Sequence, residues 1–217
     1  MKAFIFDKDG VLAETFDMHL EAFVKTFSEV GIKITKKDLI KRYGMKTHEI
    51  VKMMMKDKEK EITEETAKNM AEKKENYYRE LVEGKLKLLP GVKEFLAYLK
   101  SKGYRIGVAS SASLESIKQL LIETNIEKFF DAMVSGFDIK LSKPNPDIFL
   151  ECAKKLNVKP EDCVVVEDSV HGIEAAKRAR MKSLAVTTGQ TSRKDLESLN
   201  PNWILNSLED FRKIGEI

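Results

Sequence analysis

A small set of acidic residues, with one lysine and one serine, stands where chemistry could occur in this 217-residue chain. The acidic residues form two groups, each directly after a short apolar run, and the serine follows a third such run. The set comprises Asp7, Asp9, Ser110, Lys143, Glu167 and Asp168. Carboxylates brought close together repel one another and favour a divalent cation, and oxygen donors suit Mg²⁺ better than zinc. The pattern therefore indicates a magnesium site.

Together with the lysine and the serine, such a site could act on a phosphoryl group. A bound cation lets an anionic nucleophile approach an anionic phosphate, while the Lys143 ammonium neutralises charge that builds up on the phosphate oxygens. The Ser110 hydroxyl and the backbone N–H of Ser111 could donate to the same oxygens. One carboxylate remains to attack, and the resulting aspartyl phosphate is an anhydride that a second step can cleave.

These residues can act together only if the fold brings them to one place. Phe4, Ile5 and Phe6 form an apolar run typical of a buried parallel strand. From residue 90 onward, strand-like and helix-like segments alternate, which predicts an α/β fold with a Rossmann-like parallel sheet. Further strands are predicted at residues 104–109, 132–134, 163–166, 183–186 and 203–205. The carboxyl ends of parallel strands share one edge of the sheet, so the candidate residues should converge there.

Residues 15–87 have a different character. Their apolar residues recur at helical spacing, and no strand-like run interrupts them. Thr35 followed by Asp38, and Thr63 followed by Glu64, are typical helix starts. We therefore predict two units, an α/β core domain formed by residues 1–14 and 88–217, and an all-helical cap domain, residues 15–87, inserted into it.

The composition argues against several other classes of protein. The net charge is +3, with 38 basic residues spread among 35 acidic ones, so nucleic acid is not an expected partner. No stretch approaches the roughly 20 apolar residues of a membrane span, and the N-terminus has no long apolar segment. Cys152 and Cys163 lack the spacing of a metal site and should be reduced thiols in the core. We expect a monomeric, cytoplasmic protein with no membrane partner.

Four motifs in a fixed order give the chain a resemblance to the haloacid dehalogenase superfamily, in its branch of phosphatases and β-phosphoglucomutase-like enzymes. The motifs are, in order, Asp7-x-Asp9-Gly10-Val11, Val108-Ala109-Ser110-Ser111, Ser142-Lys143-Pro144-Asn145-Pro146 and Glu167-Asp168-Ser169-x-x-Gly172. The resemblance spans nearly the whole chain. It implies the superfamily's α/β core with a helical cap between the first strand and the second motif.

The resemblance also implies a role for each core residue. Asp7 would be the nucleophile, and Asp9 would give a proton to the leaving group and then take one from water. Mg²⁺ would be bound by the Asp7 side chain, the Asp9 carbonyl and Asp168, with Glu167 in support. The phosphate would be bound by Ser110, Ser111 and Lys143. Asp9 must be protonated for its first role, and we expect its crowded, partly desolvated surroundings to favour that state.

The cap should select the substrate, because the core motifs contact only a phosphoryl group. Thr15 and His19 match a threonine and a histidine of relatives that resemble β-phosphoglucomutase, although a hinge or core role for His19 is the alternative. Thr47 stands where such mutases carry an arginine, and the adjacent Lys46 lacks the planar fork of an arginine. We expect Thr15, His19 and Lys46 to face the cleft of the core domain.

The leading hypothesis is a Mg²⁺-dependent phosphatase that hydrolyses a small phosphorylated metabolite, such as a sugar phosphate or phosphoglycolate, through an aspartyl phosphate. A β-phosphoglucomutase-like phosphomutase is the alternative, since the two activities share every core residue. A dehalogenase needs neither magnesium nor Asp9, and a phosphonoacetaldehyde hydrolase, which would use Lys46 as a Schiff base, also lacks that second aspartate. A non-enzymatic receiver domain combines Mg²⁺, an aspartyl phosphate and a lysine, but it has no helical insertion.

Overall fold

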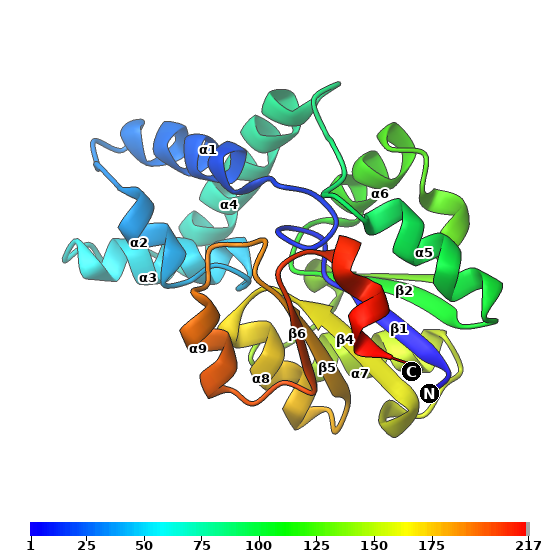
Figure 1. Ribbon diagram of the computed structural model, residues 1–217. Coiled ribbons are helices and arrows are strands. Elements are labelled where there is room, and N and C mark those ends of the chain that lie inside the picture. The colour runs from blue at the N-terminus through cyan, green and yellow to red at the C-terminus, as the bar shows by residue number, and fades with distance from the viewer. Residues whose placement is uncertain (216–217) are drawn as a thin grey trace.

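A six-stranded parallel sheet forms the centre of the computed structural model, which describes residues 1–215 (Figure 1). Its strands lie in the order β3-β2-β1-β4-β5-β6, so the first strand of the chain is central. The strands are β1 (Ala3–Phe6), β2 (Arg105–Ser110), β3 (Ala132–Ser135), β4 (Cys163–Glu167), β5 (Lys182–Val186) and β6 (Trp203–Leu205). The predicted strands are therefore confirmed, with ends that differ by at most one residue.

Different helices cover the two faces of the sheet, which explains the unbroken apolar runs of its strands. Phe4 and Phe6 pack with residues of α5 (Val92–Ser101) and α6 (Leu114–Glu123) on one face. Ala3 and Ile5 pack against α7 (Asp147–Lys155) and α8 (Val170–Arg178) on the other. Successive strand residues point to opposite faces, and both faces are buried here.

The regular elements between β1 and α5 are all helices, and they lie on one side of the molecule (Figure 1). We call its members the cap helices: α1 (Phe16–Ser28), α2 (Lys36–Ile40), α3 (Thr47–Asp57) and α4 (Glu64–Val82). They have an apolar cluster of their own, which includes Phe23, Phe27 and Met54. The predicted helix starts are confirmed, because Thr35 forms a capping box at α2 and Thr63 caps α4.

Two short segments connect the cap helices to the sheet and run side by side. Ala13 forms an antiparallel bridge with Leu88, and the backbone N–H of Leu89 donates to the carbonyl of Leu12 at 2.9 Å. The predicted boundaries between core and cap, after residues 14 and 87, lie next to this bridge. The division into two domains at these positions stays a prediction.

The predicted α/β class with a Rossmann-like parallel sheet is confirmed. Both cysteines are buried free thiols, as expected. Ser207 caps a 3₁₀ helix, η4 (Leu208–Ile214). Shorter helical segments are η1 (Glu127–Phe129), η2 (Gly136–Asp138), η3 (Pro160–Asp162) and α9 (Arg193–Ser198). Within residues 1–215, no helix combines the length and the apolar character that a membrane crossing requires.

Candidate active site

The sheet brings the ends of three neighbouring strands together. Phe6, the last residue of β1, pairs with Val108 of β2 on one side and with Val166 of β4 on the other. Asp7 directly follows β1, whereas Ser110 and Glu167 are the last residues of β2 and β4. The backbone N–H of Asp7 donates to the carbonyl of Val166 at 3.0 Å, which keeps Asp7 beside β4. The shared carboxyl edge of the sheet therefore gathers residues that are far apart in the sequence.

Lys143 joins two of these carboxylates from a loop that enters from the side of α7. Its ammonium donates to Asp7 Oδ1 and to Glu167 Oε1, each at 2.6 Å, and its side chain is 1% exposed. Burial disfavours the ammonium, but the two carboxylates outweigh that effect and hold the pKa of Lys143 above its usual range. The lysine is thus a fixed positive charge next to the predicted nucleophile.

Glu167 is fully buried, and both of its carboxylate oxygens accept hydrogen bonds. Its Oε2 accepts hydrogen bonds from the backbone N–H groups of Asp168 and Ser169 at 2.9 and 3.0 Å, and from the Ser169 hydroxyl at 2.9 Å. Gly172, in the first turn of α8, leaves the space that this carboxylate occupies, since a Cβ there would lie 1.9 Å from Glu167 Cδ. Both carboxylate oxygens are therefore engaged in holding Lys143 and the loop after β4.

Asp168, the residue after Glu167, has one carboxylate oxygen without a hydrogen-bond partner. Its Oδ2 is buried without a hydrogen bond, in a space that a Cβ on Gly10 or Gly189 would fill. Burial raises the pKa of Asp168 well above its usual range, with further increases from Glu167 and Asp7. Burial likewise raises the pKa of Asp7 to about 7, although Lys143 opposes that change. A divalent cation bound between these two carboxyls would lower both pKa values.

These residues fit a divalent cation held by few protein ligands. No group of three or more His, Cys, Asp and Glu side chains among the described residues is arranged to bind a metal. The donors expected for this cation are the carboxylates of Asp7 and Asp168, which line the same cavity, and the backbone carbonyl of Asp9. Mg²⁺ usually keeps several waters and takes only one or two carboxylates, so such a donor set suits it.

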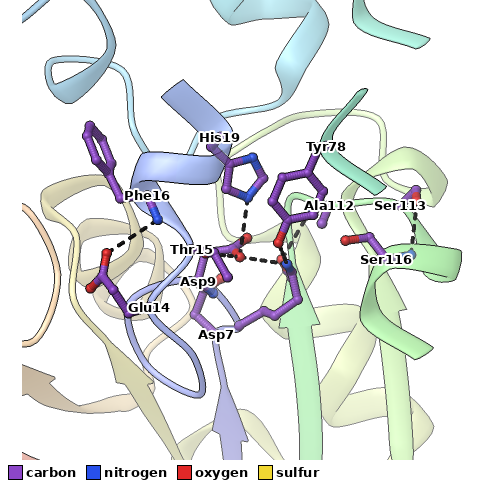
Figure 2. A network of polar contacts seen from close by, with 12 residues as sticks. Asp7, Asp9, Glu14, Thr15, Phe16, His19, Tyr78, Ala112, Ser113 and Ser116 are labelled. Atoms are coloured by element: carbon purple, nitrogen blue, oxygen red, sulfur yellow. Dashed lines mark hydrogen bonds and ion pairs between the residues drawn. The ribbon is translucent and has the colours of Figure 1, made fainter. Parts of the chain in front are cut away.

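Asp9 is surrounded by donors (Figure 2). Its Oδ1 accepts from the Lys8 ammonium at 2.6 Å and from the Thr15 hydroxyl at 2.5 Å, and His19 Nε2 lies 3.3 Å away. Burial works against its charge, but Lys8 and His19 prevail and hold the pKa of Asp9 below its usual range. The expectation that a desolvated site keeps Asp9 protonated is therefore wrong for this state of the protein, because Lys8 supplies a buried positive charge.

His19 is held on both sides. Its ring stacks on Tyr78 of α4 with centroids 3.9 Å apart (Figure 2). On its other side, the Lys74 ammonium lies 2.6 Å from Nδ1. An ammonium can only donate, so Nδ1 accepts and the ring proton is on Nε2, which faces Asp9. Burial and the Lys74 charge lower the pKa of His19 to about 4, although Asp9 opposes them, so this neutral form is the stable one.

A cavity of about 40 Å³ lies between the sheet edge and the cap helices. The predicted site residues that line it are Asp7, Asp9, His19, Ser110, Ser111 and Asp168. Thr15 lies beside it through its bond to Asp9. Lys46 is placed elsewhere, because its ammonium donates to the carbonyls of Ile139 and Lys140 in the loop that precedes Lys143.

Several buried polar residues of the site were missed by the sequence analysis. One is Lys8, which is fully buried and stands between Asp7 and Asp9 in the sequence. The others come from α4 and are Lys74, Glu75 and Tyr78. The burial of the α4 residues could have been inferred from their spacing. Lys74 and Tyr78 continue, at helical intervals, the buried face that begins with Ala67, Met70 and Ala71. Charged residues at such positions are normally taken as exposed, which hides them.

The fold and the site together define an α/β enzyme of phosphoryl transfer. Residues 4–186 match the model of the family described as haloacid dehalogenase-like hydrolase. The chain belongs to this family, and the predicted superfamily is confirmed.

Relatives of known name include both phosphatases and mutases. The chain is 38% identical over 186 residues to a phosphorylated carbohydrates phosphatase of Thermotoga maritima, covering 85% of this chain and 84% of that protein. It is 32% identical over 185 residues to hexitol phosphatase B of Escherichia coli, covering 85% and 82%. The crystal structure of β-phosphoglucomutase from Clostridium difficile has a TM-score of 0.87 at 33% identity, covering 97% of this chain and 92% of that one.

Proposed function

We propose that this protein is a Mg²⁺-dependent phosphatase of small phosphorylated carbohydrates, which acts through an aspartyl phosphate on Asp7. The observation that supports the proposal is the buried Lys143 ammonium, which lies 2.6 Å from a carboxylate oxygen of both Asp7 and Glu167. A nucleophile with a fixed cation at its side, at the open edge of a sheet, is an arrangement suited to phosphoryl transfer.

In the first step, a carboxylate oxygen of Asp7 attacks phosphorus and the bond from phosphorus to the ester oxygen breaks. Lys143 stabilises the negative charge that develops on the phosphoryl oxygens, together with the Ser110 hydroxyl and the Ser111 N–H. Mg²⁺, when bound, would supply further positive charge to these oxygens. The departing alkoxide takes a proton from Asp9. An arriving phosphate dianion favours protonation of a neighbouring carboxylate, which opposes the effect of Lys8 on Asp9.

In the second step, water attacks the phosphorus of the aspartyl phosphate. Asp9, now ionised, takes a proton from that water, and the bond between phosphorus and the Asp7 oxygen breaks. Inorganic phosphate leaves, Asp7 is again a free carboxylate, and Asp9 is again protonated. Lys8 and Thr15 hold Asp9 in position for both proton transfers through hydrogen bonds to its Oδ1, and His19 Nε2 lies 3.3 Å from the same oxygen.

A phosphomutase is the second candidate, and the likeness to β-phosphoglucomutase of Clostridium difficile favours it. The two activities differ in what meets the aspartyl phosphate, which is water in a phosphatase and a second substrate hydroxyl in a mutase. The greater identity to a phosphorylated carbohydrates phosphatase supports hydrolysis. Release of inorganic phosphate distinguishes it from isomerisation that depends on a sugar bisphosphate.

The proposal is tested by measuring phosphate release from a panel of carbohydrate phosphates, with Mg²⁺ and with a chelator. We expect release that requires Mg²⁺ and that is lost in the Asp7→Asn variant, because an amide cannot form the aspartyl phosphate. An active Asp7→Asn protein, or full activity in the presence of the chelator, would contradict the proposal.

A further inference from the structure

The wall of the cavity that faces Asp7 is formed by the cap helices and carries its own polar group. Thr47 of α3 and Lys74 and Glu75 of α4 line this wall, with Phe23, Leu39 and Ile50 around them. None of these residues has a part in phosphoryl transfer as derived above. They would meet the portion of a substrate that lies beyond its phosphate.

Glu75 has one satisfied oxygen and one that lacks a partner. Its Oε1 accepts from the Thr47 hydroxyl at 2.6 Å and from the Lys74 ammonium at 3.0 Å. Its Oε2 is buried without any hydrogen bond, and the residue is only 5% exposed. A buried carboxylate oxygen without a donor is costly, so a ligand hydroxyl that donates to it would bind favourably.

The charges of this wall disfavour a second anion. The Lys74 ammonium is already engaged, at 2.6 Å from His19 Nδ1 and 3.0 Å from Glu75. Among the described residues that the cap helices contribute to the cavity, no other lysine or arginine occurs. A second phosphate placed here would meet the Glu75 carboxylate without a free cation to compensate it.

We propose that Glu75 is a specificity-determining residue, whose Oε2 accepts a hydrogen bond from a neutral hydroxyl of a phosphorylated carbohydrate and which disfavours a bisphosphate. This inference rests on the proposed function, since it concerns the far end of the same substrate. The cavity measures about 40 Å³, whereas ligand pockets usually measure about 300–1,000 Å³. The cap helices must therefore move away for the substrate to enter, and Glu75 meets the hydroxyl as they return.

The test compares three probes of similar length: sorbitol 6-phosphate, n-hexyl phosphate, which has no hydroxyls, and fructose 1,6-bisphosphate. We expect the wild-type kcat/KM to be about tenfold or more higher for sorbitol 6-phosphate than for either other probe, as a hydrogen bond to a charged group allows. The Glu75→Gln variant should lose most of this preference. Glu72→Gln, an exposed position on the same helix, should keep it.

Two results would overturn the inference. One is a wild-type protein that turns over hexyl phosphate or the bisphosphate as well as sorbitol 6-phosphate. The other is a Glu75→Gln protein that keeps the wild-type preference. Calorimetric binding of the three probes to the Asp7→Asn variant reports the same preference without turnover. An enzyme that binds with this preference but releases no phosphate would contradict the proposed function alone.

Discussion

Lys8, which stands between the two aspartates of the first motif in the sequence, is a charged residue with a fully buried side chain. Its ammonium donates to Asp9 at 2.6 Å and to the Tyr78 hydroxyl at 3.1 Å. Methionine would keep a similar volume but leave Asp9 without its closest cation. Breaking one side of a buried ion pair costs about 3–5 kcal/mol. We expect urea unfolding of Lys8→Met to show a loss of about 3 kcal/mol in the free energy of unfolding.

The matched control is Lys2→Met. The Lys2 side chain is 71% exposed in its ion pair with Asp162, and such surface pairs contribute less than about 1 kcal/mol. A Lys8→Met protein that loses no more stability than Lys2→Met would show that the buried charge is dispensable.

The raised pKa of Asp7 couples metal binding to pH. Burial sets that pKa at about 7, so between pH 3.8 and about 7 the metal-free protein holds a proton that the unfolded chain has released. The contribution of Asp7 to the free energy of unfolding therefore falls as the pH rises through this window. Mg²⁺ needs the ionised carboxylate and competes with the proton. We expect Mg²⁺ to raise the Tm more above pH 7 than below it, and an equal rise on both sides would exclude Asp7 as a ligand.

Helix α8 positions the acidic pair that precedes it. The Ser169 hydroxyl accepts a hydrogen bond from the N–H of Gly172 at 3.0 Å and donates one to Glu167 at 2.9 Å. The first turn of the helix therefore positions the Glu167 carboxylate, which in turn binds the Lys143 ammonium. A Cβ at position 172 would overlap Glu167. We expect Gly172→Ala to lower stability by about 1–3 kcal/mol, as overpacking does, and to lower phosphatase activity through the displaced lysine.

Chemical denaturation and phosphate-release assays measure the two effects. The control is Glu174→Ala in the same helix, because Glu174 forms a solvent-accessible ion pair with Arg178 at 3.6 Å. This variant should retain both the stability and the phosphatase activity. Full activity in Gly172→Ala would mean that the contact between α8 and Glu167 does not position the lysine.

Across the molecule as a whole, hydrogen bonds connect the segment of the cap helices to the loop that carries Lys143. The Lys46 ammonium donates to the Ile139 and Lys140 carbonyls, and the Ser142 hydroxyl donates to Glu49 of α3. Ser111 also donates to the carbonyl of Gly44 at 2.6 Å. These contacts join the cap helices to two of the loops that surround the site, so closing the cap and ordering the site are linked.

Lys46→Met should weaken this fastening without altering the chemistry at Asp7. We expect faster hydrogen exchange in residues 139–143 and a several-fold higher KM, because less of the protein is in the closed form at a given substrate concentration. The control is Lys52→Met, because Lys52 lies within α3, the helix that begins directly after Lys46, and pairs with Glu64 on the surface. Unchanged exchange in Lys46→Met would mean that Lys46 does not hold the loop.

The core of the site could be predicted because strand ends are readable in a sequence. Asp7, Ser110 and Asp168 each follow a short apolar run, and a parallel sheet has one carboxyl edge, so their convergence needed no knowledge of the cap. Lys8 and Glu75 could not be predicted in this way. Their burial depends on what packs across the cavity, as in the bond from Lys8 to a tyrosine that is 70 residues away. Lys46 was expected in the cleft because it adjoins the position at which the mutases carry an arginine, and that position does not say which acceptor the Lys46 ammonium meets.

The most direct test of the central claim is to trap the covalent intermediate. Enzyme that is turning over a carbohydrate phosphate with Mg²⁺ is quenched in acid, and its peptides are analysed by mass spectrometry. We expect a phosphoryl group on the peptide that contains Asp7 and none on that peptide in the Asp7→Asn variant. A phosphoryl group on a different residue, or steady turnover with no labelled peptide, would contradict it.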